Sequence, residues 1–306
     1  MRWNKALNGL LVIFIVLNVA LGWINYDRFN RFYKVSEERI QTIKGLLADR
    51  QIEVKADLPT LFIPRSSIWI EPMPITSTLR DDLVNRVFGK ERQGVTITNE
   101  SSGEYGKNAL IYRKEGAELA FYKTFITYNN HAARDENVSL SMKQANKFAK
   151  DFVKQLQLED YLKEVKIDYR SGSYGAEVTY YEVYRGLPIF DSYVKMKISP
   201  KGVFEAEVRC LEVTDQVSLT KPLYPIDQVL FALQKPIGEN KAYVIESVEL
   251  GYRLSQTEGV HILSEEAVPM YKITIEGLSD PIFVNAYTNT YEEILFISLV
   301  LWYIEN

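Results

Sequence analysis

An uncharged and strongly apolar run near the N-terminus constrains this 306-residue chain more than any other feature. The run extends from Ala6 to Tyr26, and Trp23 lies close to its end. A helix rises about 1.5 Å per residue, so a run of this length covers the ~30 Å hydrocarbon core of a bilayer with both aromatic rings at the interface. We therefore predict a cytoplasmic tail at residues 1–5 and a single transmembrane helix at residues 6–26.

The same run has one alternative interpretation, a cleaved signal peptide. Signal peptides have a shorter apolar region followed by small residues at the cleavage site. The only candidate site is the poor sequence Ala20-Leu21-Gly22, so a permanent anchor is favoured.

Basic residues lie on both sides of the run: Arg2 and Lys5 before it, and Arg28, Arg31, Lys34 and Arg39 after it. Taken alone, the excess after the run would place the bulk of the chain in the cytoplasm.

Three residues interrupt the apolar character of the predicted transmembrane helix. Asn18, Gly22 and Asn25 follow one another at i, i+4 and i+7, which places them on one face of the helix. In lipid, asparagine hydrogen-bonds across helices and glycine permits close backbone approach. The stripe predicts contact with a partner transmembrane helix. The alternative is that Asn25 lies at the interface and Gly22 is incidental.

The composition excludes one class of partner and one kind of covalent stabilisation. With 36 basic and 40 acidic residues, the chain has a net charge of -4 and lacks the basic excess that phosphate binding needs, so we expect no nucleic-acid partner. The single cysteine, Cys210, excludes an intramolecular disulfide and is expected to be a small buried hydrophobe. Twenty tyrosines beside fourteen phenylalanines favour strands with half-buried surfaces.

Periodic apolar residues predict the elements that follow the anchor. Ile40, Ile43 and Leu47 predict a helix in a stalk that spans residues 27–58. Residues 59–137 are expected to form a first α+β module, with a helix ending at Gly89 and then strands. A polar and unpatterned stretch from Thr127 to Val138 predicts the domain boundary.

One pattern, a helix followed by a meander of strands, occurs twice in residues 138–291. The first copy begins at the helix cap Ser141 and the second at Pro225. The predicted fold class is therefore α+β, with an N-terminal transmembrane helix followed by repeated modules in which a helix lies on an antiparallel sheet. The apolar tail at residues 292–306 is too short to span a bilayer and is expected to form an added strand or a membrane-surface segment.

No residue pattern predicts a catalytic, cofactor-binding or metal site. His131 and His261 are the only histidines, and neither has a metal-ligand spacing. Ser192 and Lys195 match a Ser-x-x-Lys pattern, but the surrounding residues alternate like a strand and point them to opposite faces. The adjacent carboxylates at 265–266 and 292–293 are expected in solvated turns. We therefore expect no catalytic residues, no cofactor and no metal, and a protein that is not an enzyme.

Segments spread over most of the chain, from residue 1 to about residue 291, carry a resemblance to a known family. Met1-Arg-Trp3-Asn-Lys5, directly before the anchor, resembles the opening of the YycI (WalI) family of membrane-anchored regulatory proteins of Gram-positive bacteria. Tyr181–Phe190, followed by a turn at Lys201-Gly202, is similar to a strand and turn of that family. Three further segments resemble its closing strands: Val248–Tyr252, Ala267–Ile273 and Phe283–Ala286.

This resemblance implies both a place and a role. The chain would be held in the cell membrane by a single pass, with its C-terminal bulk extracytoplasmic and its modules of cystatin-like or PepSY-like form. It would bind and modulate a sensor histidine kinase of the WalK (YycG) type that controls cell-wall metabolism, together with a YycH-like protein. The alternative is a cell-envelope enzyme or a protease-inhibiting PepSY-like domain, for which a deep cleft lined by groups of shifted pKa would be diagnostic.

Overall fold

The computed structural model describes residues 2–100, 108–135, 138–237, 242–255, 265–278 and 280–291. The chain divides into two compact units, each assembled from separate stretches of sequence. The first unit comprises Met1–Ser66, Leu219–Leu250 and Met270–Asn306, and the second comprises Ser67–Ser218 and Gly251–Pro269. Two long strands, β12 and β13, therefore contribute residues to both units.

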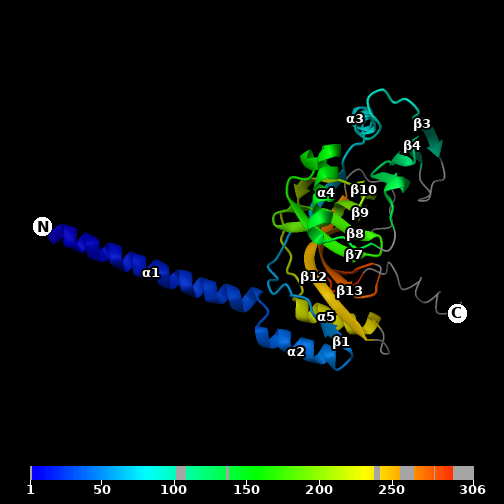
Figure 1. Cartoon of the computed structure of the whole chain (residues 1–306). Coiled ribbons are helices and arrows are strands. Elements are labelled where there is room, and N and C mark those ends of the chain that lie inside the picture. The colour runs from blue at the N-terminus through cyan, green and yellow to red at the C-terminus, as the bar shows by residue number, and fades with distance from the viewer. Residues whose placement is uncertain are drawn as a thin grey trace. The chain divides into compact units, whose positions relative to one another are not determined.

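The elements follow the order shown in Figure 1. The first unit contains α1 (Arg2–Tyr33), α2 (Glu37–Ala48), β1 (Ile52–Val54), α5 (Ile226–Ile237), part of β12 (Tyr243–Leu254), part of β13 (Glu265–Ile275) and β14 (Ile282–Asn285). The second unit contains β2 (Ile68–Pro72), α3 (Ser77–Phe88), β3 (Thr96–Glu100), β4 (Ala109–Lys114), β5 (Ala117–Phe121), β6 (Ile126–Asn130), η1 (His131–Ala133), α4 (Met142–Leu156), η2 (Leu158–Asp160), β7 (Val165–Gly172), β8 (Gly175–Tyr184), β9 (Leu187–Ser199), β10 (Gly202–Arg209), β11 (Leu211–Gln216) and the remaining parts of β12 and β13. The molecule is thus a mixed α+β protein.

The helix α1 is one continuous element that extends past the end predicted at Tyr26. Over Leu7–Tyr33 it is long and apolar enough to cross a membrane, and it is the one such helix in the part of the chain that the structure describes. Its apolar side chains are exposed on every side, including Leu10 (68%), Phe14 (65%) and Val16 (61%). A helix that is apolar all round and has no protein cover needs lipid around it. Its length and composition therefore fit a single-pass membrane anchor.

The residues predicted as a stalk, 27–58, differ from that expectation because most of them belong to the folded first unit. Residues 27–33 continue α1, and α2 buries Ile40, Ile43 and Leu47 in the core that also contains α5. The strand β1 pairs in parallel with β12. The apolar stripe that predicted a helix is also the surface that binds this helix to its neighbours, which a solvated stalk would leave uncovered.

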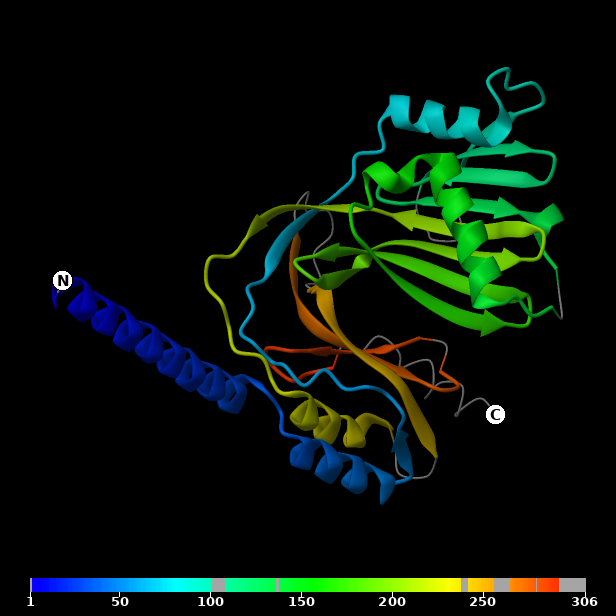
Figure 2. The ribbon, with the colours of Figure 1, turned by 60° about the vertical axis from the view of Figure 1, so that its left-hand side comes forward.

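The second unit is built on an antiparallel sheet covered by a helix. Its strands follow the order β7-β8-β9-β10-β6-β5-β4-β3, and every neighbouring pair is antiparallel. The helix α4 lies across this sheet (Figure 2) and begins with a capping box between Ser141 and Gln144. Its residues Ala149 and Phe152 share one buried core with Met196 of β9. This unit therefore has the helix on an antiparallel sheet that the sequence predicted.

The boundary predicted between Thr127 and Val138 falls inside the second unit instead of between domains. Its first residues form β6, which pairs with β5 on one side and with β10 on the other. Strand β6 thereby joins the predicted module 59–137 to the predicted region 138–291. The polar sequence hid this strand because four of its five residues are only partly buried, which leaves no alternation of apolar and polar residues to indicate it. The internal repetition within 138–291 stays a prediction. Most residues of the second predicted copy, which begins at Pro225, belong to the first unit.

Gly251 in β12 is closely packed, and its substitution tests the packing of the second unit. A Cβ atom at this position would lie 2.5 Å from the Pro188 carbonyl oxygen and 2.6 Å from the Phe190 ring. We expect Gly251→Ala to lower the free energy of unfolding by about 1–3 kcal/mol because backbone and ring must shift. Thermal unfolding of the full-length chain in mild detergent measures the change.

Gly45, in the exposed middle of α2, supplies the control for this prediction. A Cβ atom there would have no neighbour within 4 Å, so Gly45→Ala is expected to be neutral or to stabilise by up to about 1 kcal/mol. Equal unfolding temperatures for the two variants would show that the packing around Gly251 is looser than described.

Candidate functional site

Asn18, Gly22 and Asn25 lie on one exposed face of α1. A Cβ atom at Gly22 would meet nothing within 4 Å. The Asn18 side chain donates from Nδ2 to the Phe14 carbonyl oxygen, at 2.8 Å, within the same helix. This bond uses one of the two amide hydrogens and leaves the other hydrogen and the side-chain oxygen to find partners. The stripe therefore keeps hydrogen-bonding capacity for a neighbouring helix.

Backbone hydrogen bonds join the end of α1 directly to the folded residues of the first unit. The Val35 amide donates to the Thr60 carbonyl oxygen at 2.9 Å, and the Phe62 amide donates to the Tyr33 carbonyl oxygen at 3.0 Å. The Tyr33 and Phe62 rings meet edge-on with centroids 6.4 Å apart, and Val35 is buried. The end of α1 is thus fixed to residues 60–62 of the first unit by backbone bonds and a ring contact.

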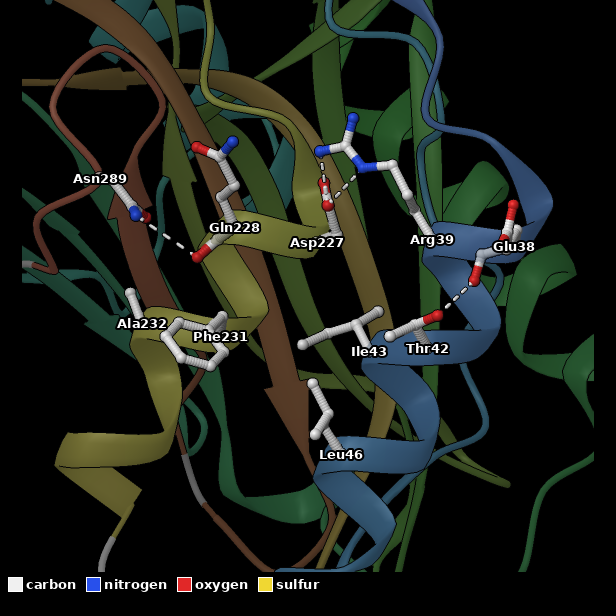
Figure 3. A pocket seen from close by; sticks show the side chains of 10 residues that line it. All are labelled: Glu38, Arg39, Thr42, Ile43, Leu46, Asp227, Gln228, Phe231, Ala232 and Asn289. Carbon is white, nitrogen blue, oxygen red and sulfur yellow. Dashed lines mark hydrogen bonds and ion pairs between the residues drawn. The ribbon is translucent and has the colours of Figure 1, made fainter.

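A groove of about 660 Å³ lies between α2 and α5, which run side by side in the first unit (Figure 3). Ten residues line it: Glu38, Arg39, Thr42, Ile43, Leu46, Asp227, Gln228, Phe231, Ala232 and Asn289. Two of the apolar side chains are largely exposed, Leu46 at 46% and Phe231 at 57%. Exposed apolar side chains that face each other across a groove are typical of an interaction surface.

The polar end of this groove is set by an ion pair between the two helices. Arg39 donates from Nε and Nη2 to Oδ2 of Asp227, at 2.8 and 2.5 Å. Asp227 lies in the first turn of α5, where the helix dipole favours its negative charge. Its second carboxylate oxygen is buried and has no hydrogen-bond partner in the described residues. This atom retains the capacity to accept a hydrogen bond from a bound group.

Beneath the ion pair, Tyr271 donates its hydroxyl to the Tyr224 carbonyl oxygen at 2.8 Å. Burial, with a smaller contribution from the Asp227 charge, raises the pKa of the Tyr271 hydroxyl. The hydroxyl therefore stays protonated and keeps donating across the physiological pH range. Asn289 binds α5 from the other side, through a 3.4 Å hydrogen bond to the Gln228 carbonyl oxygen. These bonds hold the first turns of α5 in place, while Phe231 in the same helix stays exposed.

Ser192 and Lys195 lie on strand β9 and point to opposite faces, as the alternation predicted. Ser192 is fully buried, donates to Glu182 at 2.9 Å and accepts from the Leu211 amide at 3.0 Å. Lys195 is exposed and pairs with Glu177 at 3.4 Å. Burial raises the pKa of the Glu182 carboxyl, but neither Glu182 nor Ser192 lines the groove. The hydrogen bond between Ser192 and Glu182 therefore joins strands β9 and β8.

The remaining polar positions singled out in the sequence are scattered. His131 is exposed in η1, whereas Cys210 is buried as predicted, and burial raises the pKa of its thiol to about 12. The prediction of a solvated turn at Glu265 and Glu266 is wrong. These residues begin strand β13, and Glu266 accepts a hydrogen bond from Ser67. His261, Glu292, Glu293 and the tail at 292–306 lie outside the described residues. Within the described ranges, no three His, Cys, Asp or Glu side chains gather as metal ligands would.

No sequence pattern was interpreted as this groove, although the sequence contains one signal for it. The predicted core faces of the two helices use Ile40, Ile43 and Leu47 in α2 and Val229, Leu230 and Leu233 in α5. Leu46 and Phe231 lie beside these stripes and widen the apolar surface beyond what the core needs. The Arg39–Asp227 pair has no local signal, since 188 residues separate its partners.

Comparison of the sequence with family models and with curated proteins finds no match. Among solved structures, the fold is similar to an uncharacterized protein from Eubacterium rectale, with a TM-score of 0.52 and 9% identity over 80% of this chain and 91% of that chain. The C-terminal domain of YpeB from Bacillus megaterium resembles it loosely, with a TM-score of 0.39 and 17% identity over 72% of this chain and 97% of that chain. The first similarity shows a shared fold alone.

The ion pair at the groove predicts measurable coupling between α2 and α5. The Asp227 side chain is only 14% exposed, so removal of Arg39 leaves a largely buried carboxylate unpaired. We expect Arg39→Met and Asp227→Asn each to cost about 1–2 kcal/mol of stability, and the double variant less than their sum. Urea unfolding of the full-length chain and its three variants gives the coupling energy.

The more exposed pair Lys197–Glu205, at 2.7 Å, is the control for this cycle. Its coupling is expected to stay below about 0.5 kcal/mol because solvent screens both charges. A coupling for Arg39 and Asp227 that is no larger than this control value would contradict the structural role assigned to their contact.

Proposed function

We propose that this chain is a non-enzymatic, membrane-anchored extracytoplasmic regulator that binds and modulates a sensor histidine kinase of the WalK (YycG) type. The observation that carries the proposal is the exposed stripe of Asn18, Gly22 and Asn25 on a helix that has no protein cover. The resemblance of the chain to the YycI family supports the kind of partner, and it adds a YycH-like protein to the complex.

The physical argument for a helix partner concerns the hydrogen bonds of Asn18. Inside a bilayer there is no water to satisfy an amide side chain, and the bond to Phe14 satisfies only part of it. A polar side chain from a second transmembrane helix would complete these bonds, while Gly22 lets the two backbones approach closely. A kinase with membrane-spanning helices is a partner that offers such a surface.

The folded units would provide the extracytoplasmic part of this regulator. The second unit, with α4 on its antiparallel sheet, supports a binding module of cystatin-like or PepSY-like form, and we propose that the two helix-plus-meander regions within 138–291 are repeats of that form. The bonds between the end of α1 and residues 60–62 give a physical route from a transmembrane contact to these units. Binding by rigid surfaces of this kind requires no catalytic group.

The proposed topology predicts that protease added to intact protoplasts digests the chain beyond residue 28. We expect loss of the full-length band on an immunoblot, because the folded units face outward, while a cytoplasmic marker protein survives. A chain that resists protease until the cells are lysed would place its bulk in the cytoplasm, as the count of basic residues around the anchor suggests.

The helix contact predicts that Asn18→Leu combined with Gly22→Leu weakens association with the kinase. At about 0.6–2 kcal/mol per contact, the loss corresponds to roughly 3- to 30-fold in affinity. The folded units carry no change and should be unaffected. Co-purification from membranes and a kinase-dependent reporter measure the two effects in parallel for the single and double variants.

Val16→Leu is the matched control, since Val16 lies on the opposite face of α1 and is also exposed. It should retain full association and signalling. If the double variant also retains both, while substitutions in the folded units abolish them, the contact lies outside the membrane and the proposal for α1 is wrong.

A further inference from the structure

The groove between α2 and α5 leaves apolar surface that the described residues do not cover. Leu46 and Phe231 face each other from the two helices, with Ile43 at the bottom (Figure 3). Phe231 is more exposed than Leu46, and both lie beside buried apolar stripes: Ile40, Ile43 and Leu47 in α2, and Val229, Leu230 and Leu233 in α5. A surface of this kind binds an apolar segment more favourably than it binds water.

The chain outside the described residues begins at the edge of this groove. Asn289 is one of the lining residues, and Tyr291 forms a bridge to Val284 of β14. Ile294 is only five residues beyond Asn289, so it cannot be more than about 17 Å away from it. The segment that follows is therefore tethered next to the groove whatever conformation it adopts.

The chemistry of that segment matches the groove. Residues 294–304 read ILFISLVLWYI, in which Ser298 is the one residue with a short polar side chain. Eleven residues span about 17 Å as a helix or about 36 Å as a strand, and α5 is itself about 18 Å long. Either conformation is long enough to cover the groove along its full length.

We propose that residues 294–304 dock into the groove between α2 and α5 and cover Leu46 and Phe231. The short connection from Tyr291 gives the segment an effective concentration in the millimolar range, which an untethered partner must exceed to compete. Docking removes apolar side chains of both groove and segment from water in one step. The groove is thus a self-covered surface, and a partner that uses it must displace the tail.

Thiol labelling of Leu46→Cys in the full-length chain, held in phosphatidylcholine nanodiscs, tests this docking. Cys210 is buried with a raised pKa, so it does not contribute to labelling of the folded protein. We expect a water-soluble maleimide to react with the thiol introduced at position 46 at least tenfold faster when the chain is truncated after Tyr291. A full-length variant with Ile297→Glu and Leu301→Glu should show the same acceleration, and it keeps the length of the tail.

Gln41→Cys is the control position, because Gln41 is exposed on α2 but lies outside the groove. Its labelling rate should be equal in all chains. A change at Gln41 as large as at Leu46 would show that the tail variants unfold α2, and equal rates at Leu46 in all chains would show that the tail does not cover the groove. Either result would overturn the proposal.

Oxidation of a chain that carries Leu46→Cys and Ile297→Cys identifies the occupant. Docking within one chain predicts an intramolecular disulfide, seen as a monomer with a cross-linked peptide by mass spectrometry. A disulfide-linked dimer would instead assign the groove to the tail of a second copy. Protection of Leu46 by the nanodisc lipid without any cross-link would assign it to the membrane surface. Both of these results would contradict docking within the chain.

Discussion

The uncovered apolar surface of α1 is the constraint on which the rest of this structure depends. Over Leu7–Tyr33 the helix is long and apolar enough to cross a membrane, and none of the described residues buries its most apolar window. The end of α1 is hydrogen-bonded to residues 60–62, so this helix is joined directly to the folded part of the first unit. The groove between α2 and α5 belongs to this same unit, only a short connection away from the anchor.

Two kinds of surface on the first unit have features that suit protein contacts. The stripe on α1 combines small and amide side chains, which in lipid favour helix association. The groove combines exposed apolar side chains with an ion pair at one end, and its polar groups are held by bonds within the protein. The carboxyl whose pKa is raised, Glu182, is buried between strands and holds Ser192.

The sequence predicted those elements whose signals are local. The anchor, the apolar stripe of α2 and the Ser141 cap of α4 each depend on residues within a few positions of one another. The sequence failed where pairing is distant. Glu266 looked solvated because its partner Ser67 is 199 residues away. The stalk was wrong for the same reason, since α5 covers the face of α2. Strand β6 looked like a polar linker for a different reason: four of its five residues are only partly buried, so it has no apolar alternation.

Quantitative pull-down of the tagged full-length chain from native membranes tests the central claim most directly. The comparison is with an otherwise identical chain whose residues 6–26 are replaced by an unrelated apolar helix. The account predicts that a sensor histidine kinase and a YycH-like protein are enriched with the native anchor, and that kinase recovery falls several-fold with the replaced one. Equal kinase recovery with both anchors, or no kinase with either, would contradict it.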